Sequence, residues 1–190
     1  GGRKMHSVLL GALGSGRVAG AYLIAGSEGT ARAQTDEFLE RLFCEQGSGC
    51  GECSGCRKIK AGFHPDILRI DSGERSIKVA DVQNVGEWIS RKSFEGGYKA
   101  VVIPKADTMV EAAQNKLLKS IEEPPDRTVF LLLAQAGKNL LPTVLSRCII
   151  IRMREEDKEA VCEDIRQRLD LTTMSARVLA GAAGYDLYAA

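Results

Sequence analysis

The sequence lacks the features that point to a membrane or to a broad nucleic-acid surface. Its 190 residues contain no apolar run near the roughly 20 residues that a membrane-spanning helix needs. The first residues, Gly1 to His6, lack the apolar core of a signal peptide. The formal net charge is only +1, so any contact with DNA requires a local basic patch or a partner chain. We therefore expect a cytoplasmic protein that does not contact a membrane.

Residues 21–33, near the start of the chain, have the layout of a phosphate-binding loop but lack its functional side chains. In the pattern G-x-x-x-x-G-K-[ST], the lysine reaches the β- and γ-phosphates and the hydroxyl ligates Mg²⁺. The residues at or inside the pattern are Gly26, Gly29, Ala31, Arg32 and Ala33. Ala33 offers no oxygen to a metal, and the planar guanidinium of Arg32 does not replace a compact ammonium. We expect no bound ATP.

Cysteine, by contrast, is concentrated. Four of the six cysteines, Cys44, Cys50, Cys53 and Cys56, follow the spacing C-x5-C-x2-C-x2-C. Without a secretory signal, such a cluster favours a metal site in a reducing compartment over disulfides. Four thiolates can surround a tetrahedral Zn²⁺ and leave no open position, which indicates a structural role. The alternatives are four free or partly oxidised thiols, or an iron–sulfur cluster.

Strand-like and helix-like segments alternate along most of the chain. Apolar runs predict strands at 21–25, 66–70, 99–103, 128–133 and 148–151. Helical periodicity and terminators predict helices at 8–14, 31–43, 79–89, 109–121 and 140–145. This alternation predicts an α/β domain with a mostly parallel five-stranded sheet, interrupted at about 44–60 by the cysteine-rich insertion.

The pattern changes after the last predicted strand. From Glu155 onward it is helical only, over residues 155–169 and 172–183. We therefore predict an α/β domain over residues 1–153 and a small helical domain over residues 154–190.

Several stretches match one protein family in order along nearly the whole chain. Besides the altered loop and the four cysteines, they are His64-Pro-Asp-Ile67, Phe94-Glu-Gly-Gly-Tyr-Lys99, Asn115-Lys-Leu-Leu-Lys-Ser-Ile-Glu-Glu-Pro-Pro125 and Leu141-Pro-Thr-Val-Leu-Ser-Arg-Cys148. On these motifs the chain resembles the AAA+ clamp-loader subunits of bacterial DNA polymerase III. The resemblance implies a P-loop NTPase-like AAA+ fold, a zinc ion in the insertion, and a helical lid domain at the end. It also implies a further C-terminal collar, so we expect the chain to be a fragment.

The resemblance identifies a second altered part of the ATP site. In an active AAA+ ATPase, the strand at 99–103 is followed by an aspartate that holds Mg²⁺ and a glutamate that positions the attacking water. The aligned residues here are Pro104 and Lys105. Proline cannot ligate magnesium, and a lysine cannot act as the base. Asp107 is expected to be a turn or capping residue. We predict that this chain does not hydrolyse ATP.

The resemblance implies a functional role for one charged residue, Arg147. In the motif Ser146-Arg147-Cys148, Arg147 is implied to be an arginine finger that points into the ATP site of a neighbouring subunit. Arginine suits this role because its fork binds phosphate oxygens bidentately and stays charged. Taken alone, it is a surface arginine before a strand. His64 is expected to be structural, and Glu122 and Glu123 to form a solvated helix end.

The function implied is that of a non-hydrolysing subunit of the clamp loader, with no catalytic activity from this chain alone. It would belong to the DNA polymerase III holoenzyme, a DNA-directed DNA polymerase, at the nucleoid-associated replisome. The implied partners are the ATPase subunits gamma/tau, the delta subunit and, through the complex, the sliding clamp and primer-template DNA. One alternative is an active ATPase subunit like gamma/tau. Another is a zinc-dependent nucleic-acid-binding module, with only Arg57, Lys58 and Lys60 as its basic face.

Overall fold

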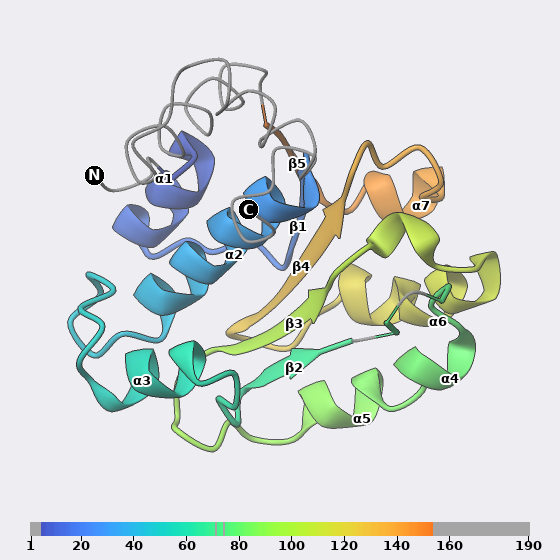
Figure 1. Ribbon diagram of the computed structural model, residues 1–190. Coiled ribbons are helices and arrows are strands. Elements are labelled where there is room, and N and C mark those ends of the chain that lie inside the picture. Colours follow the sequence, from blue (N-terminus) through green and yellow to red (C-terminus); the bar gives the residue numbers. More distant parts are fainter. Residues whose placement is uncertain (1–4, 71, 74, 154–190) are drawn as a thin grey trace, which may run out of the picture.

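A sheet of five parallel strands forms the centre of the molecule (Figure 1). The computed structural model describes residues 5–70, 72–73 and 75–153. The strands are β1 (Ala21–Ala25), β2 (Ile67–Arg69), β3 (Lys99–Ile103), β4 (Thr128–Ala134) and β5 (Ile149–Arg152), in the order β2-β3-β4-β1-β5. All five predicted strands and their parallel arrangement are confirmed. The predicted helical domain, which contains the last of the six cysteines, Cys162, lies outside the described residues.

Helices cover both faces of the sheet, which explains the continuous apolar runs of the strands. Every residue of β1, β3 and β4 is buried, as expected for a parallel sheet enclosed on two sides. Leu23 and Phe130 lie in the core beneath one helical layer, whereas Tyr22 and Leu131 lie in the core beneath the other. Neighbouring residues of one strand thus point to opposite cores, in keeping with the two-residue period of a strand.

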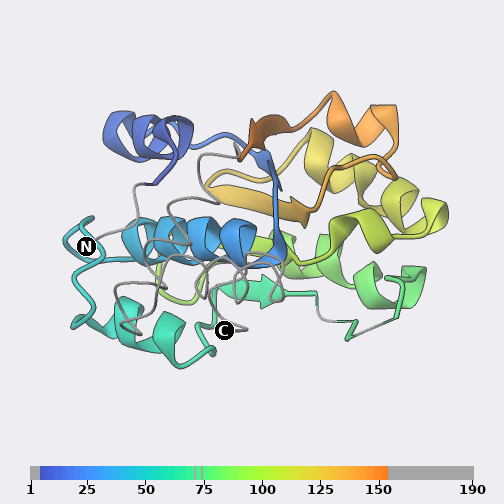
Figure 2. The same ribbon diagram turned by 45° about the horizontal axis from the view of Figure 1, so that its top comes forward.

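The helices divide between the two faces (Figures 1 and 2). On one face lie α1 (Ser7–Ser15), α2 (Glu28–Leu42) and α3 (Ser54–Lys60). On the other lie α4 (Val79–Val82), α5 (Val85–Ser90), α6 (Glu111–Glu122) and α7 (Pro142–Leu145). A short 3-10 turn, η1 (Ala106–Thr108), follows β3.

One predicted helix is divided in the structure, and one observed helix was not predicted. The helix predicted over residues 79–89 is two short helices, α4 and α5, separated at Gln83 and Asn84. Asparagine is a weak helix former, and the break still leaves Val82, Val85 and Ile89 buried. Within the cysteine-rich insertion, α3 was not predicted, because seven residues are too few to show a helical period.

The segment that carries Arg147 is tied to α6 by the buried side chain of Gln114. Its amide nitrogen donates to the carbonyls of Met109 (3.1 Å) and Asn139 (3.0 Å). Its amide oxygen accepts from the N–H of Leu141 at 2.7 Å. A buried amide with three satisfied hydrogen bonds fixes its neighbours firmly. Gln114 therefore fixes the start of α7 relative to α6.

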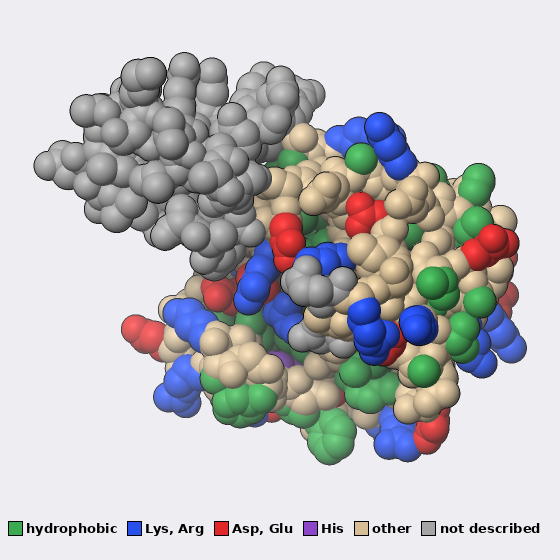
Figure 3. Space-filling model, turned by 45° about the vertical axis from the view of Figure 1, so that its right-hand side comes forward, with side chains coloured by type: hydrophobic (Ala, Val, Ile, Leu, Met, Phe, Trp, Pro, Cys, Tyr) green, Lys and Arg blue, Asp and Glu red, His purple; other side chains and the backbone are tan. Residues whose placement is uncertain are grey.

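The surface matches the near-neutral net charge of the sequence. Lys and Arg side chains are interspersed with Asp and Glu over the described part of the face in Figure 3. This mixture favours no electrostatic attraction to nucleic acid over that face. Among the described residues, no helix has the length and apolar character needed to span a membrane.

Candidate functional site

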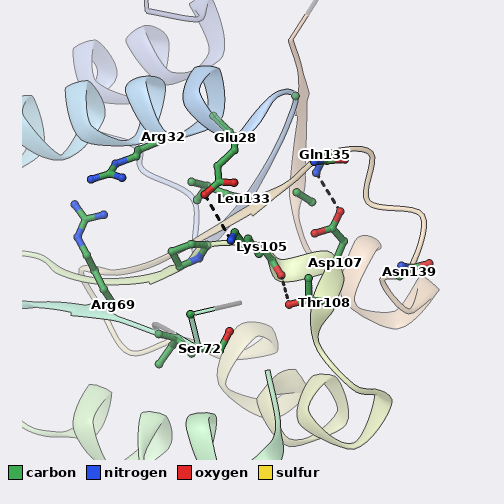
Figure 4. A pocket seen from close by; sticks show the side chains of 16 residues that line it. Glu28, Arg32, Arg69, Ser72, Lys105, Asp107, Thr108, Leu133, Gln135 and Asn139 are labelled. Atoms are coloured by element: carbon green, nitrogen blue, oxygen red, sulfur yellow. Dashed lines mark hydrogen bonds and ion pairs between the residues drawn. The ribbon is translucent and has the colours of Figure 1, made fainter. Parts of the chain in front are cut away.

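A pocket of about 540 Å³ opens at the carboxyl edge of the sheet (Figure 4). This is the edge at which open α/β sheets bind their ligands. The lining residues come from the β1–α2 corner, from the ends of β2, β3 and β4, and from the loops after them. Among them are Gly26, Ala31 and Arg32 of the altered loop, together with Pro104 and Lys105. The structure thus brings both predicted halves of the altered nucleotide site to one pocket.

The segment with the phosphate-loop pattern is not an open loop. Strand β1 ends at Ala25 and α2 already begins at Glu28, three residues before the predicted start at Ala31. Ser27 caps the helix, since its hydroxyl accepts from the N–H of Thr30 at 3.4 Å. The N–H of Ala31 donates to the carbonyl of Ser27 at 2.9 Å. Backbone N–H groups that would cradle phosphates in a working loop therefore belong to the first turn of a helix.

The charged side chains around the pocket interact with one another. Arg32 Nε lies 3.7 Å from a carboxylate oxygen of Asp36, one turn further along α2, and Arg69 donates to the other oxygen at 2.8 Å. Across the pocket, Lys105 Nζ lies 4.0 Å from Glu28 Oε1 (Figure 4). Neither Arg32 nor Lys105 is therefore an isolated cation awaiting a phosphate.

The residues after β3 adopt a special backbone conformation. Lys105 has φ 52° and ψ 42°, in the left-handed region, which is costly for a residue with a β-carbon. It leads into η1, where Asp107 accepts from the N–H of Gln135 at 3.1 Å. Asp107 therefore links the loops that follow β3 and β4, which agrees with the capping role expected for it.

The four clustered cysteines converge at the ends of α2 and α3. Their Sγ atoms all lie within 4.8 Å of one another. Cys44 comes just after α2, and Cys53 caps α3. A tetrahedron with Zn–S distances of about 2.3 Å has S···S edges of about 3.8 Å, so small movements of the side chains would complete a four-thiolate site. The predicted convergence is confirmed, and the set can hold a metal ion.

Hydrogen bonds and burial shift the pKa values of Cys44, Cys53 and Cys56 in different directions. Backbone N–H groups of Cys50 and Gln46 donate to Cys44 Sγ, both at 3.4 Å; these bonds lower the pKa of Cys44 to about 5. The N–H of Cys56 likewise lowers the pKa of Cys53. Burial raises the pKa of Cys56 to about 12. A bound cation would supply the charge that ionises this buried thiol.

Glycine makes the close packing of the insertion possible. A β-carbon on Gly55 would lie 2.3 Å from the carbonyl oxygen of Phe43, far inside any allowed contact. Gly47, Gly49 and Gly51 all have positive φ, a conformation that glycine adopts without steric cost. These residues let the chain turn sharply between the thiols.

His64 connects the insertion to the loop before β3. The side chain is buried, and its ring lies 4.5 Å from that of Phe43. Nδ1 accepts from the N–H of Asp66 at 3.2 Å, and Nε2 lies 3.2 Å from a carboxylate oxygen of Glu95. Burial lowers the pKa of His64, although the charges of Glu95 and Asp66 oppose this effect.

Arg147 lies between α7 and β5, far in the sequence from the four clustered cysteines. Its Nη1 donates to the carbonyl of Thr143 at 2.8 Å and approaches the hydroxyl of Ser146 at 3.3 Å. Its Nη2 donates to Glu122 Oε1 at 2.6 Å. Cys148 packs against the core, and burial raises its pKa to about 11. Cys148, the residue directly before β5, thus anchors the end of the motif in the core.

The contact with Glu122 corrects the prediction of a simply solvated helix end. Glu122 is about half exposed, but it forms an ion pair with Arg147. No sequence signal pointed to this pairing, because the two residues are 25 positions apart. Glu122 ends α6, whereas Arg147 lies between α7 and β5.

Comparisons with known proteins give a consistent result. The model of the family described as "DNA polymerase III, delta subunit" matches residues 1–157. DNA polymerase III subunit delta' of Bacillus subtilis is 32% identical over 180 residues, which are 93% of this chain and 54% of that protein. The same subunit of Pseudomonas aeruginosa is 37% identical over 72% of this chain and 43% of that protein. DNA polymerase III subunit tau of Escherichia coli is 30% identical over 86% of this chain and 26% of that protein.

Solved structures resemble the fold. A DNA polymerase III, gamma subunit-related protein of Thermotoga maritima gives a TM-score of 0.57 at 23% identity, over 85% of this chain and 53% of that one. The Bacillus subtilis DNA clamp loader delta protein gives 0.52 at 16% identity, over 91% of this chain and 51% of that one. The chain spans about half the length, or less, of the relatives it matches.

Proposed function

The chain belongs to the delta-prime family of DNA polymerase III subunits and has the AAA+ fold, and from this we propose that it is a non-hydrolysing subunit of a clamp loader. Its contribution to DNA replication would be an arginine finger, Arg147, supplied in trans to the ATP site of a neighbouring subunit. The partners would be the ATPase subunits gamma/tau and the delta subunit. Through the complex, the chain would act on the sliding clamp and primer-template DNA in the bacterial cytoplasm.

The main support for a non-hydrolysing role is that the pocket at the carboxyl edge of the sheet lacks the side chains and the open loop of an ATP site. Pro104 and Lys105 at its wall offer no acid. The next residue of α2 after the lining residue Arg32 is Ala33, which offers no hydroxyl for Mg²⁺. The backbone that would cradle phosphates is the first turn of α2. Side chains and backbone therefore argue independently against ATP chemistry in this chain, and against an active subunit like gamma/tau.

Support for Arg147 as a finger comes from its chemistry and its accessibility. The side chain is about one-third exposed, and an adjacent carboxylate holds its guanidinium. A planar guanidinium can exchange one oxyanion for another without changing its own charge. In phosphoryl transfer, such a group stabilises the charge that spreads over the γ-phosphate, and it is worth about 10³–10⁵ in rate.

For the four-cysteine site we propose a structural Zn²⁺. The donor set is all sulfur, and its Sγ atoms lie within 4.8 Å of one another, which suits a tetrahedral ion with no open position. When bound, the ion would supply a cross-link between the end of α2 and the start of α3. The residues that would hold it are Cys44, Cys50, Cys53 and Cys56.

The test of the proposed function is a reconstituted complex of the full-length protein with its ATPase partners. We expect no turnover of Mg·ATP by the protein alone. In the complex, Arg147→Ala should slow hydrolysis at the facing ATP site by roughly 10³-fold and impair clamp loading while assembly stays intact. Arg152→Ala, which removes an exposed arginine of β5, is the matched control. Unchanged hydrolysis in Arg147→Ala, or turnover by the protein alone, would contradict the proposal.

A further inference from the structure

The ion pair between Arg147 and Glu122 gives the proposed finger a partner within its own chain. Nη2 of Arg147 donates to Glu122 Oε1 at 2.6 Å, and Nη1 is occupied by the carbonyl of Thr143. The carboxylate of Glu122 is an oxyanion. It accepts from the same guanidinium N–H groups of Arg147 that a phosphate would use. While this contact persists, part of the guanidinium fork is not available to a ligand.

The position of Glu122 is electrostatically unfavourable without Arg147. Glu122 is the last residue of α6, and Glu123 follows it at the C-cap. The C-terminus of a helix carries partial negative charge from its unpaired carbonyls, and acids there are destabilising. Arg147, through its ion pair with Glu122, and Lys119 in the last turn of α6 offset this clustering of negative charge.

The contact leaves the guanidinium incompletely satisfied. Arg147 Nε is buried and has no hydrogen-bond partner among the described residues. Buried donors are nearly always paired in folded proteins, so an unpaired one calls for an explanation. A phosphate group brings several acceptor oxygens where the carboxylate uses one. Once the side chain is released from Glu122 and Nε is uncovered, phosphate can therefore bind the guanidinium more completely.

The contact is also weak enough to be exchanged. The side chains of Arg147 and Glu122 are 32% and 51% exposed, and ion pairs at such positions contribute little because water screens them. A bidentate arginine–phosphate pair in a closed interface is stronger. The balance therefore favours the phosphate once a nucleotide-loaded neighbour is in place.

From these observations we propose that Glu122 is an internal competitor for the finger. It holds Arg147 in the separate subunit, and the γ-phosphate of a neighbour's ATP displaces it when the subunits engage. The inference rests on the proposed function of Arg147 and adds a regulating residue to the same site. Its consequence is that part of the binding energy of the ATP-loaded neighbour is used to break the contact with Glu122.

The decisive variant is Glu122→Gln, which removes the charge but keeps the size and one acceptor oxygen. We expect the full-length variant to bind a partner subunit loaded with a non-hydrolysable ATP analogue about two- to fivefold more tightly, the range for a partly exposed ion pair. The ATP concentration for half-maximal hydrolysis should fall by a similar factor, while kcat at saturating ATP stays unchanged. Affinity for the nucleotide-free partner should not change.

Three controls test whether Glu122 competes for Arg147 or only stabilises the fold. Glu123→Gln removes the neighbouring charge and should have no effect. Glu122→Ala should show the same gain as Glu122→Gln, and thermal unfolding of both checks that they fold. In an Arg147→Ala background, Glu122→Gln should lose its effect, as a double-mutant cycle requires for two residues that act through each other.

The results for these variants distinguish the role of Glu122 as a competitor from the role of Arg147 as a finger. Suppose that Arg147→Ala impairs hydrolysis but Glu122→Gln does not increase the affinity for the ATP-loaded partner. The proposal that Glu122 competes for Arg147 is then wrong, while Arg147 remains the arginine finger. A gain that persists in the Arg147→Ala background also overturns the competitor. If Arg147→Ala leaves hydrolysis unchanged, both the finger and the competitor are wrong.

Discussion

The side chain of Met153 lies directly against Gly26, so that a β-carbon on Gly26 would come within 2.9 Å of Met153 Cβ. Beyond the end of β5, the N–H of Met153 donates to the carbonyl of Ala25 at 2.9 Å. This packing fills the space on one side of Gly26, and the early start of α2 turns the residues that follow it into a helix. The altered nucleotide site is thus changed in its backbone as well as in its side chains.

Restoring the missing side chains should not restore nucleotide binding. In the double variant Arg32→Lys, Ala33→Thr, we expect an ATP dissociation constant weaker than about 1 mM, equivalent to about −4 kcal/mol, because residues 28–31 remain in a helix turn. Titration calorimetry with Mg·ATP measures this directly, with an ATPase partner as the positive control. A micromolar dissociation constant would mean that the loop opens once its side chains are correct.

The metal site should contribute to folding. Elemental analysis of the purified protein should find one zinc per chain, and Cys56→Ser should abolish it, because Cys56 is the most deeply buried of the four thiols. A loss of about 2 kcal/mol would lower Tm by roughly 4–8 °C for a domain of this size. Cys148→Ser is the control and should keep its zinc. Brown colour and bound iron would instead identify an iron–sulfur cluster.

Stability should fall below about pH 6.5 because of His64. Burial lowers the pKa of His64 in the folded state, so the unfolded chain binds more protons as the pH drops through the unfolded value. One such proton changes the unfolding free energy by at most about 1.4 kcal/mol per pH unit. Denaturant titrations at pH 7.5 and 5.5 should therefore show a larger loss for the wild type than for His64→Gln. Equal losses would contradict the assignment.

A second variant tests the sign of this effect. The charge of Glu95 raises the pKa of His64 against the effect of burial, so Glu95→Gln should lower that pKa further. The loss of stability should then extend to lower pH than in the wild type. A shorter range of loss would mean that Glu95 does not favour the charged imidazole.

The buried carboxylate of Asp66 should be important for the loop before β3. It accepts from the N–H groups of Phe94 (2.7 Å) and Glu95 (3.0 Å), and from the hydroxyl of Ser93 at 3.3 Å. Asp66→Asn turns one acceptor into a donor, so a buried N–H loses its partner. We expect a loss of about 1–3 kcal/mol, measured by urea unfolding. Asp126→Asn, on the exposed turn before β4, should change the stability little, and equal effects of the two variants would refute the role of Asp66.

The fold was largely predictable because its signals are local. Apolar runs such as Lys99–Ile103 are buried on both faces wherever they pair, and the prolines after Glu123 end α6 in any context. The division of residues 79–89 into two helices was not predictable, because the same apolar period suits one helix or two. The predicted boundary near Met153 stays a prediction.

The sequence alone determined which atoms are available to the sites. Ala33 has no hydroxyl, Pro104 and Lys105 are not acids, and Cys44, Cys50, Cys53 and Cys56 are close enough in sequence to meet. The tertiary structure decided what those residues meet, because contacts between segments far apart depend on how the layers pack. Only folding brings Met153 onto Gly26, Glu28 opposite Lys105, and Glu122 onto Arg147. No spacing rule encodes these pairs, since each joins two elements whose positions are set by the whole core.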